Sequence, residues 1–145
     1  MTPRQTIVEQ ARTWLGTPYL HQGRTKGVAV DCIGLIIGVS AELGHPIIAP
    51  DDYTASPNGD MLMKHARRQF VEIMDRKVPV PGDIMVLWGW NRREPQHFAY
   101  VGLIGGRLSM IHAFSKRKEV VEHAIDSFWQ NRLVALFNIP GTEPA

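Results

Sequence analysis

The sequence is poor in cysteine, since Cys32 is the only one among 145 residues. An intramolecular disulfide is therefore excluded, and the single thiol is available for chemistry or for packing. Long apolar runs are also absent. None reaches the roughly 18 residues of a membrane-spanning helix, and the N-terminal stretch lacks the apolar core of a signal peptide. We therefore expect synthesis in the cytoplasm and no insertion into a membrane.

Excess charge of one sign is lacking as well, because the formal net charge is only +2. A field strong enough to attract a polyanion is not expected, which argues against a nucleic-acid partner. Short basic clusters occur at 67–68, 92–93 and 116–118. They fit solvated helix ends and hairpin tips, while contact with an acidic polymer surface stays open.

Repeats, low-complexity tracts and metal-binding motifs are missing too. The six histidines and the cysteine show neither HExxH nor Cys-x-x-Cys spacing, so no metal or organic cofactor is expected. A composition with 44% hydrophobic and 21% charged residues is that of a packed globular chain. Its length suits one hydrophobic core, and we expect a single domain over residues 1–145.

Helices are predicted first along the chain. Thr2-Pro3 is a helix-start signal, and Gly16 ends the run of apolar residues at helical spacing that follows it. Asp31 opens a second apolar run, CIGLIIGVSAEL, which Gly44 ends. Asn58 is the expected cap of a third helix, which contains Met61, Leu62, His65 and Ala66.

Strands are predicted for the second half. The segment PVPGD at 79–83 has the composition of a turn, and apolar runs of strand length follow it at 84–90, 97–104, 107–114, 119–123 and 132–139. Helices followed by antiparallel strands indicate an α+β domain.

Cys32 falls in the first turn of the second predicted helix. Unpaired N–H groups and the positive end of the helix dipole favour a thiolate there, which is the reactive form of cysteine. A small buried hydrophobic residue is the alternative interpretation, because free cysteines are usually buried. A nearby base would favour the reactive interpretation.

A histidine pair supplies that candidate base. Gly105-Gly106 suits a two-residue hairpin turn that pairs Ile104 with Arg107. Counting back from this turn sets Ala99 opposite His112 and His97 opposite Phe114, so both histidines share one face as diagonal neighbours. They suit a base and its orienting partner, although satisfied structural histidines remain the alternative. The other four histidines are expected away from this face and stay unassigned: His21, His45, His65 and His123.

Five segments in order resemble the NlpC-type cysteine peptidases, which have a papain-like core and cleave peptide bonds in bacterial cell-wall stem peptides. They are LGTPYLHQGR, DCIGLI around the cysteine, PGDIMVL, HFAYVGLIGG and MIHAF. The resemblance spans most of the chain. It implies N-terminal helices packed on an antiparallel sheet of about five strands.

Site residues follow from this resemblance position by position. Cys32 matches the nucleophile, His97 the general base and acid, and His112 the third residue that orients the imidazole. Tyr19 matches a tyrosine whose hydroxyl borders the nucleophile, with packing alone as the alternative. Asp31 combines a helix cap with a possible substrate contact, and both roles are compatible.

Two positions depart from the common family pattern. Ile33 replaces the serine of DCSG that, with the preceding aspartate, helps hold the free amine of an L-alanine, and HFAYVG replaces the commoner HVGIY. The resemblance is closest to short members associated with phage tails, including those in gene transfer agents.

The function implied is hydrolysis of the γ-D-glutamyl to diamino-acid bond in peptidoglycan stem peptides, without a cofactor. Peptidoglycan and phage-like tail proteins are the expected partners. The chain would be packed into a particle or released by lysis of the host. A structural tail component that keeps the fold without turnover is the alternative.

Overall fold

The computed structural model describes residues 1–48, 59–89 and 94–145. Within these ranges the elements are, in chain order, α1 (Arg4–Arg12), β1 (Arg24–Thr25), β2 (Ala29–Val30), α2 (Cys32–Glu42), α3 (Gly59–Gln69), β3 (Val71–Glu72), β4 (Ile84–Trp88), β5 (Pro95–Ile104), β6 (Arg107–Phe114), β7 (Glu119–Ala124), α4 (Ser127–Gln130) and β8 (Leu133–Asn138). The predicted α+β class is confirmed.

The predicted helix signals have the expected local geometry. Pro3 is the extended residue before α1, and Asp31 caps α2 by accepting a hydrogen bond of 2.7 Å from the Gly34 N–H. Gly16 and Gly44 follow α1 and α2 with φ of +84° and +85°, a conformation that glycine adopts without strain. The predicted cap of α3, Asn58, lies outside the described residues.

The main sheet has six strands in the order β3-β8-β4-β5-β6-β7, and every neighbouring pair is antiparallel. The five predicted strands correspond to β4, β5, β6, β7 and β8. The prediction missed β3, the β1–β2 hairpin and α4. The first two consist of two-residue strands, too short to show an alternating pattern.

The β5–β6 hairpin has the predicted register. Gly105 and Gly106 both have positive φ, at +55° and +79°, as a tight two-residue turn requires. Pairing runs from Ile104 opposite Arg107 to Tyr100 opposite Ile111 without a shift. The register prediction is therefore confirmed over these five pairs.

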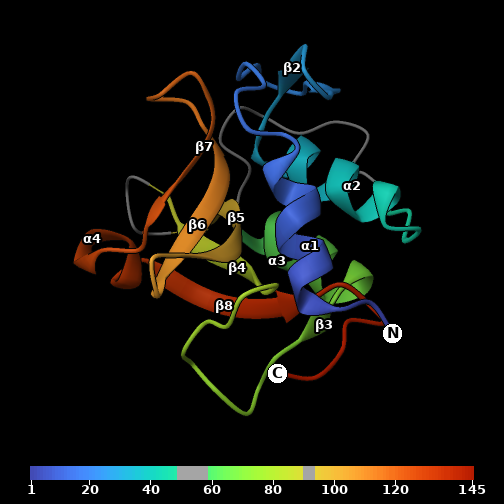
Figure 1. Ribbon diagram of the computed structural model, residues 1–145, viewed down its shortest axis with the longest axis vertical. Coiled ribbons are helices and arrows are strands. Elements are labelled where there is room, and N and C mark those ends of the chain that lie inside the picture. The colour runs from blue at the N-terminus through green and yellow to red at the C-terminus, as the bar shows by residue number, and fades with distance from the viewer. Residues whose placement is uncertain (49–58, 90–93) are drawn as a thin grey trace.

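Two apolar clusters cover the two faces of the sheet. The larger one joins α1, α2 and α3 to side chains such as Ile84, Tyr100 and Phe137. The smaller one lies on the other face, where Trp129 of α4 packs with residues such as Met85 and Val101. Figure 1 shows α1, α2 and α3 together and α4 at the far edge.

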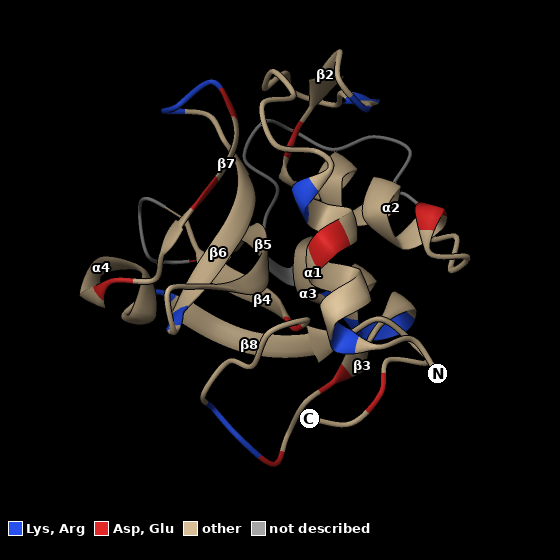
Figure 2. Cartoon of the chain, in the orientation of Figure 1, with Lys and Arg blue, Asp and Glu red and all other residues tan. Residues whose placement is uncertain are grey.

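Charged residues are spread over the molecule without one sign gathering on a single element (Figure 2). Arg67 and Arg68 occupy the last turn of α3, and residues 116–118 form the tip between β6 and β7, as expected for solvated basic clusters. The cluster at 92–93 lies outside the described residues. Across the described ranges, every helix is too short or too polar to cross a lipid bilayer.

Candidate active site

Cys32 is the first residue of α2, and its side chain lies against β5. The sulfur is 4.0 Å from the Gln96 carbonyl oxygen, to which the thiol donates, and it also accepts from the Phe98 backbone N–H. Cys32 therefore contacts the main chain on both sides of His97. Cys32 and His97 both lie in the part of the chain that the structure describes, and the Cys32 thiol makes no hydrogen bond to the His97 imidazole.

The thiol is neutral in this arrangement. Burial, with the nearby Asp31 carboxylate, raises the pKa of Cys32 to about 12, although the backbone N–H groups of Phe98, Ile33 and Cys32 itself lower it. The sequence-based expectation of a thiolate at the helix start is therefore wrong for the substrate-free protein. The helix N-terminus acts as expected, but only 9% of the residue is exposed and the loss of hydration outweighs it.

The two predicted histidines meet. His97 Nε2 and His112 Nδ1 are 2.7 Å apart, and the ring planes are inclined by 77°. Strand pairing of β5 with β6 sets this contact up, as the diagonal arrangement predicts. The geometry suits a base and an orienting partner, and these roles remain predictions.

Both imidazoles of this pair are uncharged at neutral pH. Burial, together with the neighbouring His123, lowers the pKa of His97 to about 4. Burial lowers the pKa of His112 well below its ordinary value, and the other two histidines lower it further. His97 is therefore free to accept a proton.

His123 belongs to the same cluster, and its assignment away from this face is wrong. Its Nε2 is 2.8 Å from His112 Nε2, and its Nδ1 is 3.0 Å from the Ala124 carbonyl oxygen. The register explains the contact, because β7 pairs Val121 with His112 and His123 is two residues further on the same face. Pairing the 119–123 strand with the 107–114 strand would have revealed it.

Aromatic rings enclose this histidine chain, which we define as His97, His112 and His123. Trp129 of α4 has its ring centroid 5.2 Å from that of His112, 6.1 Å from that of His97 and 5.9 Å from that of His123. Phe114 stacks on His112 at 4.9 Å. No sequence signal points to Trp129, because the four-residue helix that carries it is too short to show a helical pattern.

Asp31 is buried and connects the preceding loop to the first turn of α2 through its two carboxylate oxygens. One carboxylate oxygen accepts from Gly34 N–H, and the other accepts from the Gln22 N–H at 2.8 Å. Gln22 has a positive φ of 63°, so this bond supports a strained loop conformation. The predicted cap role is confirmed, while contact with a substrate remains a proposal.

Tyr19 lies near both residues at the start of α2. It pairs with Val30 through an isolated bridge, and the pKa of its hydroxyl is raised to about 12 by burial and by the nearby Cys32 and Asp31. The hydroxyl is therefore protonated and able to donate a hydrogen bond. This position is consistent with the predicted place beside the sulfur.

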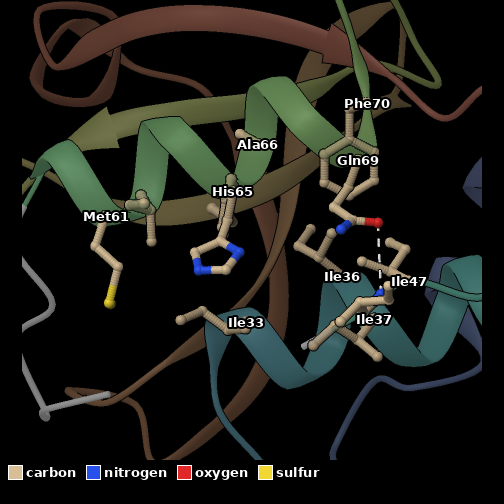
Figure 3. A pocket seen from close by; sticks show the side chains of 12 residues that line it. Ile33, Ile36, Ile37, Ile47, Met61, His65, Ala66, Gln69 and Phe70 are labelled. Atoms are coloured by element: carbon tan, nitrogen blue, oxygen red, sulfur yellow. Dashed lines mark hydrogen bonds between the residues drawn. The ribbon is translucent and has the colours of Figure 1, made fainter. Parts of the chain in front are cut away.

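Ile33 does not face a polar subsite. Its side chain enters an apolar pocket between α2 and α3, opposite His65 (Figure 3). Phe98 of β5 also lines this pocket, so it borders the β5 segment that holds Cys32. His65 thus belongs to this pocket and not to the histidine chain.

The remaining two histidines lie elsewhere. His21 Nδ1 is 3.9 Å from an Asp31 oxygen, and His45 lies beside Gly141. Over residues 1–48, 59–89 and 94–145, His, Cys, Asp and Glu side chains form no group of three that could hold a metal ion.

Comparison with known proteins places the fold. No family model matches the chain, and no curated protein matches it. Solved structures do match: the NlpC/p60 domain of the peptidoglycan hydrolase SagA has a TM-score of 0.63 and 21% identity over 94% of this chain and 98% of that one. An N-acetylmuramoyl-L-alanine amidase from Bacteroides uniformis has a TM-score of 0.64 and 12% identity over 94% and 98%.

Some of these structures are longer proteins. NlpC2 from Trichomonas vaginalis has a TM-score of 0.66 and 18% identity over 92% of this chain, which spans 44% of that protein. The chain likewise spans 41% of an NLP/P60 family protein from Staphylococcus aureus. Identities this low establish the fold alone, and the chain has the NlpC/P60-type α+β fold that the sequence predicts.

Proposed function

We propose that this chain is a cysteine peptidase that hydrolyses an amide bond in peptidoglycan stem peptides. One observation carries the proposal. The cysteine at the start of α2 touches the main chain on both sides of His97, whose imidazole is hydrogen-bonded to a second buried histidine. The fold supports it, because the similar structures include a peptidoglycan hydrolase domain and an amidase.

Acylation begins with a neutral pair. Burial opposes a charge on Cys32 or His97 alone, so the two groups ionise together when the thiol proton passes to His97 as sulfur attacks the carbonyl carbon. The oxyanion takes hydrogen bonds from the backbone N–H of Cys32, at the unpaired start of the helix, and from Tyr19. His97 then gives its proton to the leaving amine as the carbon–nitrogen bond breaks.

Deacylation uses the same base. A water molecule attacks the thioester carbonyl while His97 takes its proton, and the proton returns to sulfur as the carbon–sulfur bond breaks. His112 keeps the His97 ring oriented through both steps by its 2.7 Å hydrogen bond. The chemistry needs neither a metal ion nor an organic cofactor.

The substrate proposal is the γ-D-glutamyl to diamino-acid bond of stem peptides that are still joined to glycan. Ile33 has no hydroxyl, where the common family pattern has a serine that helps to bind a free amine, and its side chain enters the apolar pocket between α2 and α3. Asp31 already uses one acceptor site on each oxygen for backbone hydrogen bonds. An ammonium group here would lose hydration without full compensation, at a cost on the order of 1–3 kcal/mol. Selection for a free L-alanine terminus is therefore not expected.

The biological setting we propose is a tail-associated hydrolase of a phage or gene transfer agent that opens the wall locally. Support comes from the sequence resemblance, which taken over the whole chain is closest to short members associated with phage tails. Mass spectrometry of purified phage-like particles from the source cells tests it. Peptides of this chain in the particles support the setting, and their absence contradicts it.

The decisive experiment incubates the purified chain with intact peptidoglycan and identifies the released peptides by mass spectrometry. Cys32→Ala is the control, and free tripeptide and tetrapeptide are the competing substrates. Products cut after γ-D-glutamate, released by the native chain alone and more readily from intact wall, support the proposal. If Ile33→Ser leaves a strong preference for free peptides unchanged, the specificity argument fails.

A complete lack of hydrolysis would favour the alternative of a structural tail component with this fold. Fold alone does not separate the two, because similar folds carry different activities. An active native chain with an inactive Cys32→Ala variant excludes the structural interpretation.

A further inference from the structure

The hydrogen bonds along the histidine chain run in one direction. His123 Nδ1 lies 3.0 Å from the Ala124 carbonyl oxygen. A carbonyl oxygen can only accept, so this nitrogen must carry the hydrogen. With its one ring hydrogen on Nδ1, His123 presents a bare lone pair at Nε2.

The hydrogens of His112 and His97 are assigned in the same way. Because His123 Nε2 must accept, His112 Nε2 donates to it across 2.8 Å. A neutral His112 then has its lone pair on Nδ1, which must accept from His97 Nε2–H across 2.7 Å. The lone pair of His97 is thereby assigned to Nδ1.

Nδ1 is the nitrogen that a base needs at this place. It is the ring nitrogen nearest the main chain of its own residue, and the Cys32 sulfur lies against that main chain at Gln96 and Phe98. With the opposite tautomer, Nδ1 would carry a hydrogen and could not take the thiol proton. His97 therefore acts as a base only when the hydrogen bonds of the histidine chain run in this direction.

We propose that His123 is a positioning residue, which transmits the direction set by the Ala124 carbonyl through His112 and so fixes the tautomer of His97. The proposal rests on the proposed function in one respect, since it assumes that His97 is the base. Burial favours it, because His112 is fully shielded from water that would otherwise compete for either of its nitrogens. The aromatic rings of Trp129 and Phe114 hold the middle imidazole in place.

The histidine chain also stabilises the positive charge that forms on His97 during the reaction. When His97 becomes an imidazolium, the lone pair on His112 Nδ1 points at it, and the Nε2–H of His112 points at His123. The two neutral imidazoles thus present aligned dipoles to the cation, which strengthen one another in a low-dielectric setting. Removing the last acceptor should weaken both the tautomer preference and this stabilisation.

The test compares three variants. His123→Phe keeps a ring but removes the acceptor, His123→Gln keeps an acceptor for His112 and a donor for the Ala124 carbonyl, and Val121→Ala loosens the same face of β7 without touching a hydrogen bond. We expect His123→Phe to lower kcat about 10- to 100-fold with KM unchanged. His123→Gln should recover most of the loss, and Val121→Ala should match the native chain.

A second readout does not depend on activity. Nitrogen-15 NMR of the histidine side chains should show His97 and His112 with hydrogen on Nε2 in the native chain, and a mixture of tautomers in His123→Phe. A native His97 with hydrogen on Nδ1 would overturn the proposal, as would unchanged kcat and unchanged tautomers in His123→Phe. If the native chain hydrolyses nothing, the proposed function fails, and the spectra still decide the tautomer.

Discussion

Two buried polar clusters lie at opposite ends of β4. Asp83 immediately precedes the strand, is fully buried, and accepts hydrogen bonds from Arg4, Arg76 and the Asn138 amide. The histidine chain lies at the other end, where Leu87 pairs with His97. We call the first group the Asp83 cluster.

The two clusters treat charge in opposite ways. Burial alone would raise the pKa of Asp83, but hydrogen bonds from Arg76, the Val80 N–H and Arg4 lower it, so the carboxylate stays ionised. His97 and His112 have other imidazoles as neighbours, and burial keeps them neutral. An ion pair such as that of Asp83 suits a purely structural contact, whereas the neutral imidazole nitrogens of the histidine chain suit proton transfer. Loss of the first cluster should affect stability, and loss of the second should affect chemistry.

The largest effect is expected from His97→Ala. Loss of the proton acceptor should lower the rate of hydrolysis at least about 1000-fold, because general acid–base catalysis contributes ~100- to 10,000-fold. The unfolding free energy should fall by only about 1–3 kcal/mol, because the buried His112 Nδ1 loses its hydrogen-bond partner. Released peptides and thermal unfolding measure the two properties together.

The partner histidine refines this result. His112→Ala should be about 10- to 100-fold impaired, and His112→Asn should keep part of the lost activity, because its amide oxygen still accepts from His97. Equal tolerance of alanine at positions 97 and 112 would contradict the assigned roles.

Asp83→Ala should produce the reverse pattern. The guanidinium groups of Arg4 and Arg76 would lose their shared carboxylate, and breaking a buried ion pair costs about 3–5 kcal/mol of unfolding free energy. Urea unfolding measures the loss, while kcat of the folded fraction at low temperature should stay near the native value. Asp75→Ala is the control, an exposed carboxylate whose removal should cost under ~0.5 kcal/mol. A large fall in kcat without a fall in stability would break the comparison.

The two clusters should also differ in the pH range over which they affect the unfolding free energy. Below about pH 6.5 the unfolded chain protonates its histidines while folded His97 stays neutral down to about pH 4, so stability falls across this window by on the order of 3 kcal/mol. Asp83, whose folded pKa is lowered, contributes stability above its unfolded pKa of about 3.9 and loses it as pH falls through the folded pKa. His97→Phe should make the fall in unfolding free energy between about pH 6.5 and about pH 4 shallower without abolishing it, because folded His112 also stays neutral and still contributes. Asp83→Asn should act only below about pH 4. Parallel curves for all three proteins would contradict this separation.

The smallest effect concerns the resting thiol. Because burial raises the pKa of Cys32 to about 12, iodoacetamide at pH 7 should react with it at least about 10-fold more slowly than with free cysteine, which has a pKa of ~8.5. The rate of alkylation, followed by mass spectrometry, checks this. Faster alkylation than free cysteine would restore the thiolate that the helix start alone suggests.

Local signals in the sequence account for much of this fold. Gly105-Gly106 determines the register that brings His97 to His112, and Asp31 caps α2 as its side-chain chemistry requires. His123 was missed because the register of β7 depends on the conformation of the tip at 115–118, where Lys118 has a positive φ of 61°. The residue at this position is not a glycine, so the sequence carries no sign of a positive φ there.

The electrostatics of the site could not be predicted from local sequence. The helix start around Cys32 favours a thiolate, but its environment depends on strand β5, which lies more than sixty residues later in the chain. The Asp83 cluster likewise joins Arg4 to Asn138, from the two ends of the chain. Long-range packing decides both.

The most direct test of the account is detection of the covalent intermediate on Cys32. The native chain is mixed with solubilised peptidoglycan fragments, quenched with acid within seconds and digested for mass spectrometry. We expect the peptide that contains Cys32 to carry the mass of an acyl group ending in γ-D-glutamate, and we expect no such adduct in His97→Ala. Hydrolysis without any adduct on Cys32, or undiminished hydrolysis by Cys32→Ala, would contradict the account.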